Sequence, residues 1–328
     1  MKTIRIIMLA LWASVCMPVA NAQETKAEQP KGKAIIRIFT NLHTGFGQDR
    51  DDRGFELNRS YLGYQYDLGK GLQLKAVMDV GKSSAVDDLQ RIAFIKNAQV
   101  SWKTGKLTLH GGMISTIQFK VQEDFWGYRY MMMSFQDYYK WGSSADLGIS
   151  AAYKLTDWLT AEAIVVNGEG YKKVQKNDGL QYGLGATIQP LKGLTVRLYG
   201  SLNEGADQTK EDISNVATMI GYKGKSFSVA AEYNWLGNSG NVKDADMYGY
   251  SLYGTVKMNK NLEAFARYDL LTSKDDWNEA KDESTILAGM QFKLGKYVKL
   301  APNFRMYMPK KEGADNRYMA YISCFFGI

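Results

Sequence analysis

Residues 317–328 form an aromatic, strand-like segment with which the chain ends. Ile322 and Phe326 fall on one face of this segment and Phe325 falls on the other, so both faces are apolar or aromatic. A soluble domain gains little from such a terminal strand, because a typical antiparallel sheet keeps one face in water. In a membrane barrel one face meets lipid, and the last strand pairs with the first so that no edge stays free. The segment therefore predicts a closed transmembrane β-barrel.

The N-terminus has the features of an export signal. Lys2 and Arg5 precede a short apolar run over residues 6–15, and residues 20–22 form an A-x-A cleavage site. The run is shorter than the roughly 20 residues of a membrane helix. Cys16 lies near the position of a lipidated cysteine, which is the alternative interpretation. We divide the chain into a signal peptide, a short polar leader and a transmembrane barrel, at residues 1–22, 23–32 and 33–328.

Strand-like segments of alternating polarity fill the rest of the chain, and the gaps between them are alternately short and long. This alternation is typical of an antiparallel up-and-down barrel with short turns at one end and long loops at the other. We count sixteen strands, an even number as a single-chain bacterial barrel requires. Fourteen is the alternative, because the pattern is weakest over residues 82–102. The predicted strands cover residues 33–46, 55–68, 72–81, 92–102, 106–114, 145–155, 159–168, 179–189, 194–202, 213–222, 226–236, 245–258, 262–271, 283–293, 297–308 and 316–328.

Composition agrees with this all-β fold class. Glycine (32) and tyrosine (21) are abundant and proline (5) is rare, as tight turns and aromatic girdles require. Of the two cysteines, only Cys324 lies beyond the predicted signal, so no disulfide framework is expected. The net charge of +7 is spread over alternating strands and forms no basic patch, which argues against a nucleic-acid partner.

Charged residues recur inside the predicted strands. An arginine or lysine facing lipid at mid-bilayer costs about 2–4 kcal/mol, so each should face the lumen. Rows of such charges set the ion preference of a channel. For a single residue the alternative is a structural ion pair between strands, for example Arg267 with Glu232. The predicted basic lumen residues are Arg37, Arg59, Lys75, Arg197, Arg267, Lys299 and Arg305, and the acidic ones are Asp79, Glu162, Glu232, Glu263 and Asp269.

Residues 115–144 form the longest gap between strands and the third of the long loops. Loops of this length are usually functional or disordered, and this one is too aromatic to be disordered. We predict that it folds into the barrel and narrows the channel, with Lys120 and Arg129 as anion contacts. The alternative is a packed lid or a contact between subunits. The opposing acidic residues of the predicted constriction are Glu123, Asp124 and Asp137.

Catalytic and metal-binding motifs are not recognisable in the sequence. The two histidines, His43 and His110, do not belong to any catalytic motif, and we expect a protein that is not an enzyme and needs no cofactor. The acidic runs at residues 51–52 and 275–276 leave a weak alternative, binding of Ca²⁺ or divalent bridging to lipopolysaccharide.

Several segments together resemble a known family. They are FELNRSYLGYQY at residues 55–66, IKNAQVSW at 95–102, LTLHGGM at 107–113, FWGYRY at 125–130 and SADLG at 144–148. In this order they are similar to the outer-membrane porins related to the phosphate-selective porin O and P family. The resemblance implies a sixteen-stranded channel that assembles as a homotrimer.

The sequence therefore predicts a porin in the outer membrane of a Gram-negative bacterium, in contact with lipid and lipopolysaccharide. It would pass small hydrophilic solutes and ions by passive diffusion, with a mild preference for anions. Two alternatives stay open. One is a substrate-specific channel for phosphate or a similar anion, and the other is a surface adhesion or structural barrel plugged by its long loop.

Overall fold

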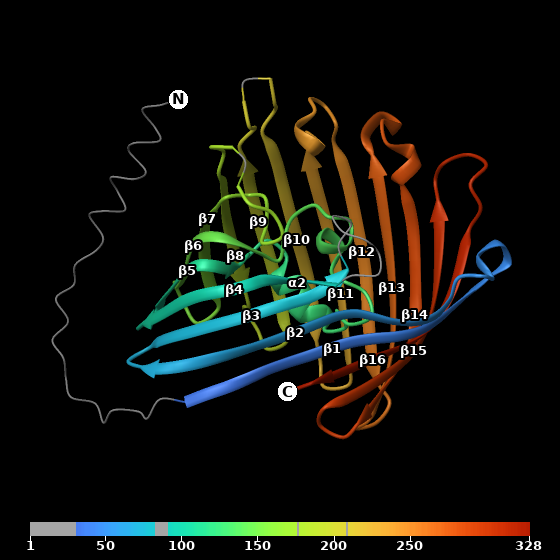
Figure 1. The fold of residues 1–328 in the computed structure, drawn as a ribbon, viewed down its shortest axis with the longest axis horizontal. Helices are drawn as coiled ribbons and strands as arrows, with labels where there is room; N and C mark the ends of the chain where they lie inside the picture. The colour runs from blue at the N-terminus through green and yellow to red at the C-terminus, as the bar shows by residue number, and fades with distance from the viewer. Residues whose placement is uncertain (1–30, 83–90, 176, 208) are drawn as a thin grey trace.

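Sixteen antiparallel strands form one closed barrel in the computed structural model, which describes residues 31–82, 91–175, 177–207 and 209–328 (Figure 1). The predicted signal peptide and the leader up to residue 30 lie outside the described residues. Each strand pairs with its neighbours in sequence order. The strands are β1 (Lys31–Phe46), β2 (Arg53–Gly69), β3 (Leu72–Lys82), β4 (Arg91–Thr104), β5 (Leu107–Ser115), β6 (Ala145–Lys154), β7 (Leu159–Val166), β8 (Gln181–Ile188), β9 (Leu194–Asn203), β10 (Ile213–Lys223), β11 (Phe227–Gly237), β12 (Met247–Lys257), β13 (Leu262–Ser273), β14 (Glu283–Leu294), β15 (Val298–Pro309) and β16 (Arg317–Gly327).

The aromatic C-terminal segment closes the barrel, as the sequence predicts. β16 pairs with β1 from Arg37 opposite Gly327 to Phe46 opposite Tyr318. β4 is present in full, so the count of sixteen is confirmed and the alternative of fourteen is wrong. The barrel begins two residues earlier than the predicted residue 33, because β1 begins at Lys31 and pairs with β2 from that residue onward.

The two ends of the barrel differ in their connections. Tight turns lie at one end, and in the β2–β3 turn Lys70 and Gly71 both have positive φ. A β-carbon at Gly71 would lie 2.0 Å from the Lys103 carbonyl oxygen, so only glycine fits there. The other end carries the long loops, which include short 3-10 turns at residues 47–49, 239–241, 274–276 and 279–281.

Side chains alternate across the wall with the period expected of strands. In β11, Phe227, Val229 and Tyr233 face outward, whereas Glu232 and Asn234 are buried on the lumen side. The outer surface therefore carries exposed large apolar residues, and the lumen carries the polar ones.

No helix in the described part of the chain is long and apolar enough to cross a membrane.

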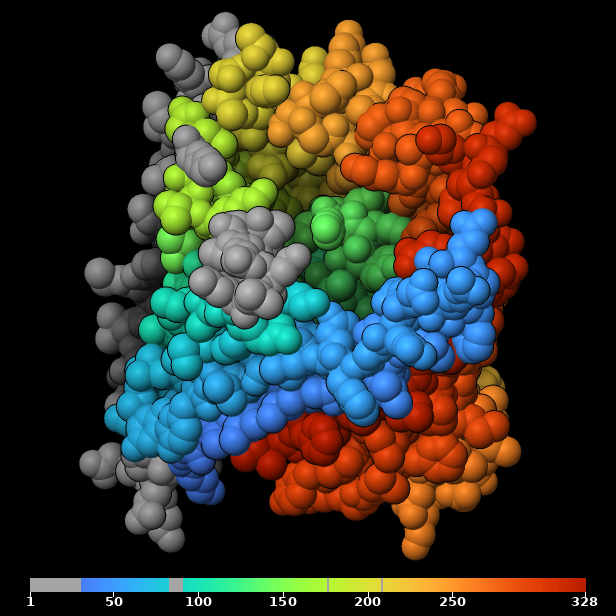
Figure 2. Space-filling view, turned by 45° about the vertical axis from the view of Figure 1, so that its right-hand side comes forward, coloured from blue at the N-terminus to red at the C-terminus, as the bar shows by residue number. Residues whose placement is uncertain are grey.

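The loop between β5 and β6, residues 116–144, folds into the barrel, and we call it the long loop. It contains two short helices, α2 (Lys120–Trp126) and α3 (Phe135–Tyr138). In the space-filling view its green atoms fill much of the space enclosed by the wall (Figure 2). Trp126 and Phe135 are almost fully buried, so the loop is packed rather than mobile.

Candidate pore constriction

Aromatic side chains attach the long loop to the wall formed by β9–β15. The Trp126 ring lies 5.2 Å from the Tyr253 ring and 6.3 Å from the Phe265 ring, both edge-on, and the Tyr128 ring lies 4.9 Å from Phe265. Edge-to-face aromatic pairs contribute about 0.5–1.5 kcal/mol each beyond burial. The hydroxyl of Tyr128 donates to Glu263 at 2.9 Å, which satisfies the polar end of the buried ring.

Two glycines in this wall make room for the loop. A β-carbon at Gly221 in β10 would lie 2.6 Å from the Phe125 ring, and one at Gly249 in β12 would lie 2.1 Å from the Phe135 ring. A glycine inside a strand often marks such a close approach. The two glycines in β10 and β12 thus help to determine where the long loop packs.

Three wall arginines donate to backbone carbonyls of the long loop. Arg197 reaches Ile117 O at 2.7 Å, Arg267 reaches Met133 O at 2.7 Å and Arg305 reaches Met131 O at 2.9 Å. Irregular backbone inside a barrel needs such partners, since an unpaired buried carbonyl is costly. These arginines face the lumen, as strand parity predicts, but the loop covers them, and all three are buried.

The ion pair suggested for Arg267 is corrected by the structure. Arg267 pairs with Asp269 on its own strand at 2.7 Å, and not with Glu232. The Glu232 carboxylate instead accepts a hydrogen bond from Tyr253 at 2.8 Å. Glu232 lies in β11 and Arg267 in β13, and β12 separates the two strands.

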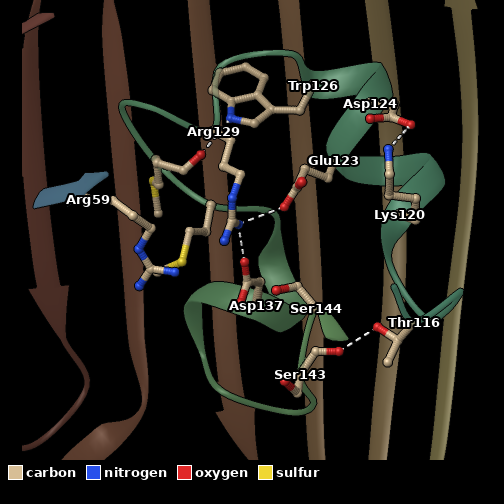
Figure 3. Close-up of polar contacts among 12 residues, drawn as sticks. Arg59, Thr116, Lys120, Glu123, Asp124, Trp126, Arg129, Asp137, Ser143 and Ser144 are labelled. Carbon is tan, nitrogen blue, oxygen red and sulfur yellow. Dashed lines mark hydrogen bonds and ion pairs between the residues drawn. The ribbon is translucent and has the colours of Figure 1, made fainter. Parts of the chain in front are cut away.

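The charges of the long loop pair mainly with one another (Figure 3). Arg129 binds Glu123 at 2.6 Å and also binds Asp137. Its second terminal nitrogen donates to the Tyr61 hydroxyl at 3.2 Å. Lys120 pairs with Asp124 on the same helix, and both side chains stay exposed to the lumen.

A cavity of about 290 Å³ lies between helix α2 of the long loop and the wall formed by β1–β4. Its acidic lining residues, Glu123 and Asp124, are the ones already paired within the loop. Within the described ranges, none of the wall cations that line the cavity forms an ion pair. These wall cations are Lys33, Arg37, Lys75 and Lys96, and they give the cavity an excess of positive charge.

Lys96 is a lining residue that strand parity misses. The register of β3 and β4 passes from Val77 opposite Asn97 to Met78 opposite Ile95, so Lys96 lies in a bulge. A bulge shifts the alternation by one residue and turns Lys96 inward. Its ammonium donates to Ser144 and lies 5.2 Å from the centre of the Tyr61 ring.

The loop between β7 and β8 also folds inward, and its residues 167–175 reach over β6 and β4 to β3, which the sequence does not reveal. Its Tyr171 hydroxyl donates to Asp79 in β3, and Arg59 pairs with the same carboxylate at 3.1 Å. Asp146 fixes the start of this loop by accepting from the amides of Gly168 and Gly170, at 2.7 and 3.1 Å.

Burial affects a charge on the same β7–β8 loop. Lys172 lies next to Tyr171, and burial lowers the pKa of its ammonium. This ammonium lies 5.1 Å from the centre of the Phe94 ring. The loop therefore brings a further cation to the end of the barrel that carries the long loops.

The other predicted residues lie apart from the cavity. Lys299 lies over the Phe325 ring at 5.3 Å. His43 contacts Asn41 at 2.8 Å and Asp52 at 3.2 Å. His110 contacts Ser101 at 2.7 Å, and no carboxylate in the described part of the chain hydrogen bonds to its other ring nitrogen.

The acidic loop runs do not gather around a common centre. The described residues contain no group of three or more His, Cys, Asp or Glu side chains placed to hold a metal ion. Asp276 pairs with Lys310, and this hydrogen bond raises the pKa of the lysine.

No protein-family model matches the chain, and no curated protein matches it at a significant level. Solved structures do match. The anion-selective porin from Comamonas acidovorans is 12% identical with a TM-score of 0.70, over 92% of this chain and 100% of that one. OmpF of Salmonella typhi is 10% identical with a TM-score of 0.69, over 90% and 97%. OprB of Pseudomonas putida is 10% identical with a TM-score of 0.69, over 90% and 94%.

The fold is that of the outer-membrane porins. Sequence identities of 10–12% show that the fold is shared and nothing more specific. The similar structures are porins of several kinds. The resemblance to the porin O and P family in particular stays a prediction.

Proposed function

We propose that the protein is a porin in the outer membrane of a Gram-negative bacterium, through which small hydrophilic solutes and ions diffuse passively with a mild preference for anions. The observation that carries the proposal is the cavity between the long loop and the β1–β4 wall. Among the residues that the structure describes, its wall cations form no ion pair, whereas the side-chain carboxylates facing them, Glu123 and Asp124, are already paired. Fixed positive charge raises the local concentration of anions. The porin fold of the neighbours supports the same proposal.

Conductance in planar bilayers tests this function. Purified, refolded protein should give stable current steps in KCl, and the reversal potential in a KCl gradient should favour chloride. A reversal potential that favours potassium would defeat the anion preference. No current from a folded, heat-modifiable barrel would defeat the channel itself.

A substrate-specific anion channel is the second candidate. Four wall cations around one cavity, none of them in an ion pair with a described residue, favour it. Phosphate should then reduce the chloride current at concentrations far below those at which it carries current itself. If phosphate and chloride simply share the pore in proportion to their concentrations, general diffusion is the function.

A plugged adhesion or structural barrel is the third candidate, and the dense packing of the long loop favours it. Shortening the loop over residues 127–133 separates the cases. A plug predicts a change from no current to current, and a constriction predicts only larger steps. We also expect a homotrimer embedded in lipid and lipopolysaccharide, which a heat-labile band near three times the monomer mass on a mild gel would support.

A further inference from the structure

We propose that the cavity on the β1–β4 wall binds small organic anions with an apolar body, such as aromatic monocarboxylates, in preference to compact anions of the same charge. This inference rests on the proposed channel function and names the solutes that the channel retains. It follows from the order of side chains along the wall, which combines cations with apolar surface.

Strand register places the lining residues in rows across the wall. Lys33 lies opposite Gln65, which lies opposite Lys75, and this forms a polar and basic row. Four residues further along β1 from Lys33, Arg37 lies opposite Tyr61. Successive side chains on one face of a strand are about 6.6–6.8 Å apart along it. Lys33 and Lys75 thus share one row, and Arg37 lies in a second row that continues through Tyr61 to Asp79, with one row between the two.

The middle row is apolar. Ile35 lies opposite Gly63, and Gly63 lies opposite Val77. A β-carbon at Gly63 would lie 2.8 Å from Val77 Cγ2, so the Val77 side chain leans over the glycine toward Ile35. Phe119 of the long loop lines the same cavity from the other side. Apolar side chains therefore lie between the row of Lys33 and Lys75 and the row of Arg37. Val77 and Phe119 are already buried, and Ile35 is the one of the three that stays partly exposed.

This arrangement discriminates between anions. A compact anion such as acetate or phosphate gains from the cations but leaves the exposed part of Ile35 in contact with water. An anion with a ring can place its carboxylate on Arg37 or Lys75 while the ring covers Ile35, which removes apolar surface from water. The cavity of about 290 Å³ lies near the lower end of small-molecule pockets, roughly 300–1,000 Å³, and therefore suits a small solute.

The test is block of the KCl current by benzoate, with acetate as the compact monocarboxylate and phosphate as the inorganic anion. Benzoate should halve the chloride current at roughly one tenth of the acetate concentration, because it alone covers the exposed part of Ile35. Ile35→Thr keeps a branched side chain but adds a hydroxyl, so it should weaken block by benzoate and leave acetate and phosphate unchanged. Lys75→Gln should weaken block by all three.

Ile322→Thr is the matched control, since this exposed isoleucine lies on the outer face of β16. A heat-modifiable band shows that each variant is folded. A channel that conducts KCl but does not distinguish benzoate from acetate overturns the inference alone, as does an unchanged benzoate block in Ile35→Thr. A folded protein with no KCl current overturns the proposed function instead.

Discussion

The two sides of the lumen use the same kinds of residue in different ways. On the β9–β15 wall, Arg197, Arg267 and Arg305 are buried and hold the backbone of the long loop. On the β1–β4 wall, Arg37 and Lys75 line a cavity and have no ion pair in the described part of the chain. A lumen-facing charge thus becomes a pore charge only where the long loop leaves a cavity in front of it. Removing charge should therefore affect stability on one wall and ion selectivity on the other.

The strongest test of the comparison is Arg267→Ala. It leaves the buried Asp269 without its ion-pair partner and Met133 O without its donor, and loss of one partner of a buried pair costs about 3–5 kcal/mol. We expect a lower urea midpoint, measured by loss of the heat-modifiable band, and larger current steps as the loop loosens. Lys154→Ala, which removes an exposed pair with Asp157, should change neither. An Arg267→Ala barrel as stable as the parent would show that the arginine does not anchor the loop.

The next largest effect should come from filling the space that receives Phe135. Gly249→Ala places a β-carbon 2.1 Å from that ring, so the loop must shift, and overpacking of this kind costs about 1–3 kcal/mol. Larger steps in planar bilayers should accompany the loss of stability. Gly54→Ala is the control, because nothing lies within 4 Å of its β-carbon. Equal behaviour of the two variants would mean that the glycine in β12 does not set the position of the loop.

The sequence predicts the barrel well because strand periodicity and turn chemistry are local. It also predicts that the loop over 115–144 folds inward, since its aromatic residues need a surface to pack against. It does not predict which wall stays open, because that depends on distant strands meeting the loop at Gly221 and Gly249. The alternation of side chains along β4 does not predict that Lys96 faces the lumen, because the bulge in β4 shifts that alternation by one residue. The reach of Tyr171 to Asp79 depends on the folded path of the β7–β8 loop.

A smaller effect, on selectivity alone, should follow from Lys75→Gln on the open wall. One unit charge about 4 Å from a passing ion contributes roughly 1 kcal/mol in water, so the preference for chloride should fall by about fivefold at most. The urea midpoint should stay the same. Lys260→Gln, in an exposed tight turn, should leave the reversal potential unchanged. A large loss of stability in Lys75→Gln would show that charges on the β1–β4 wall also stabilise the fold, which contradicts the proposed difference between the two walls.

The smallest effect should come from Tyr171→Phe. This variant tests whether the contact of the β7–β8 loop with β3 affects stability, as charges on the β9–β15 wall do, or the current, as charges on the β1–β4 wall do. The hydroxyl donates to the buried Asp79 carboxylate, and one hydrogen bond contributes about 0.5–1.5 kcal/mol net. Hydrogen exchange should therefore become faster at the amides of Gly168 and Gly170, while the current steps keep their size. Tyr250→Phe, on the outer face of β12, is the control. Unchanged exchange would mean that Asp146 alone holds the loop, because it accepts from both of those amides.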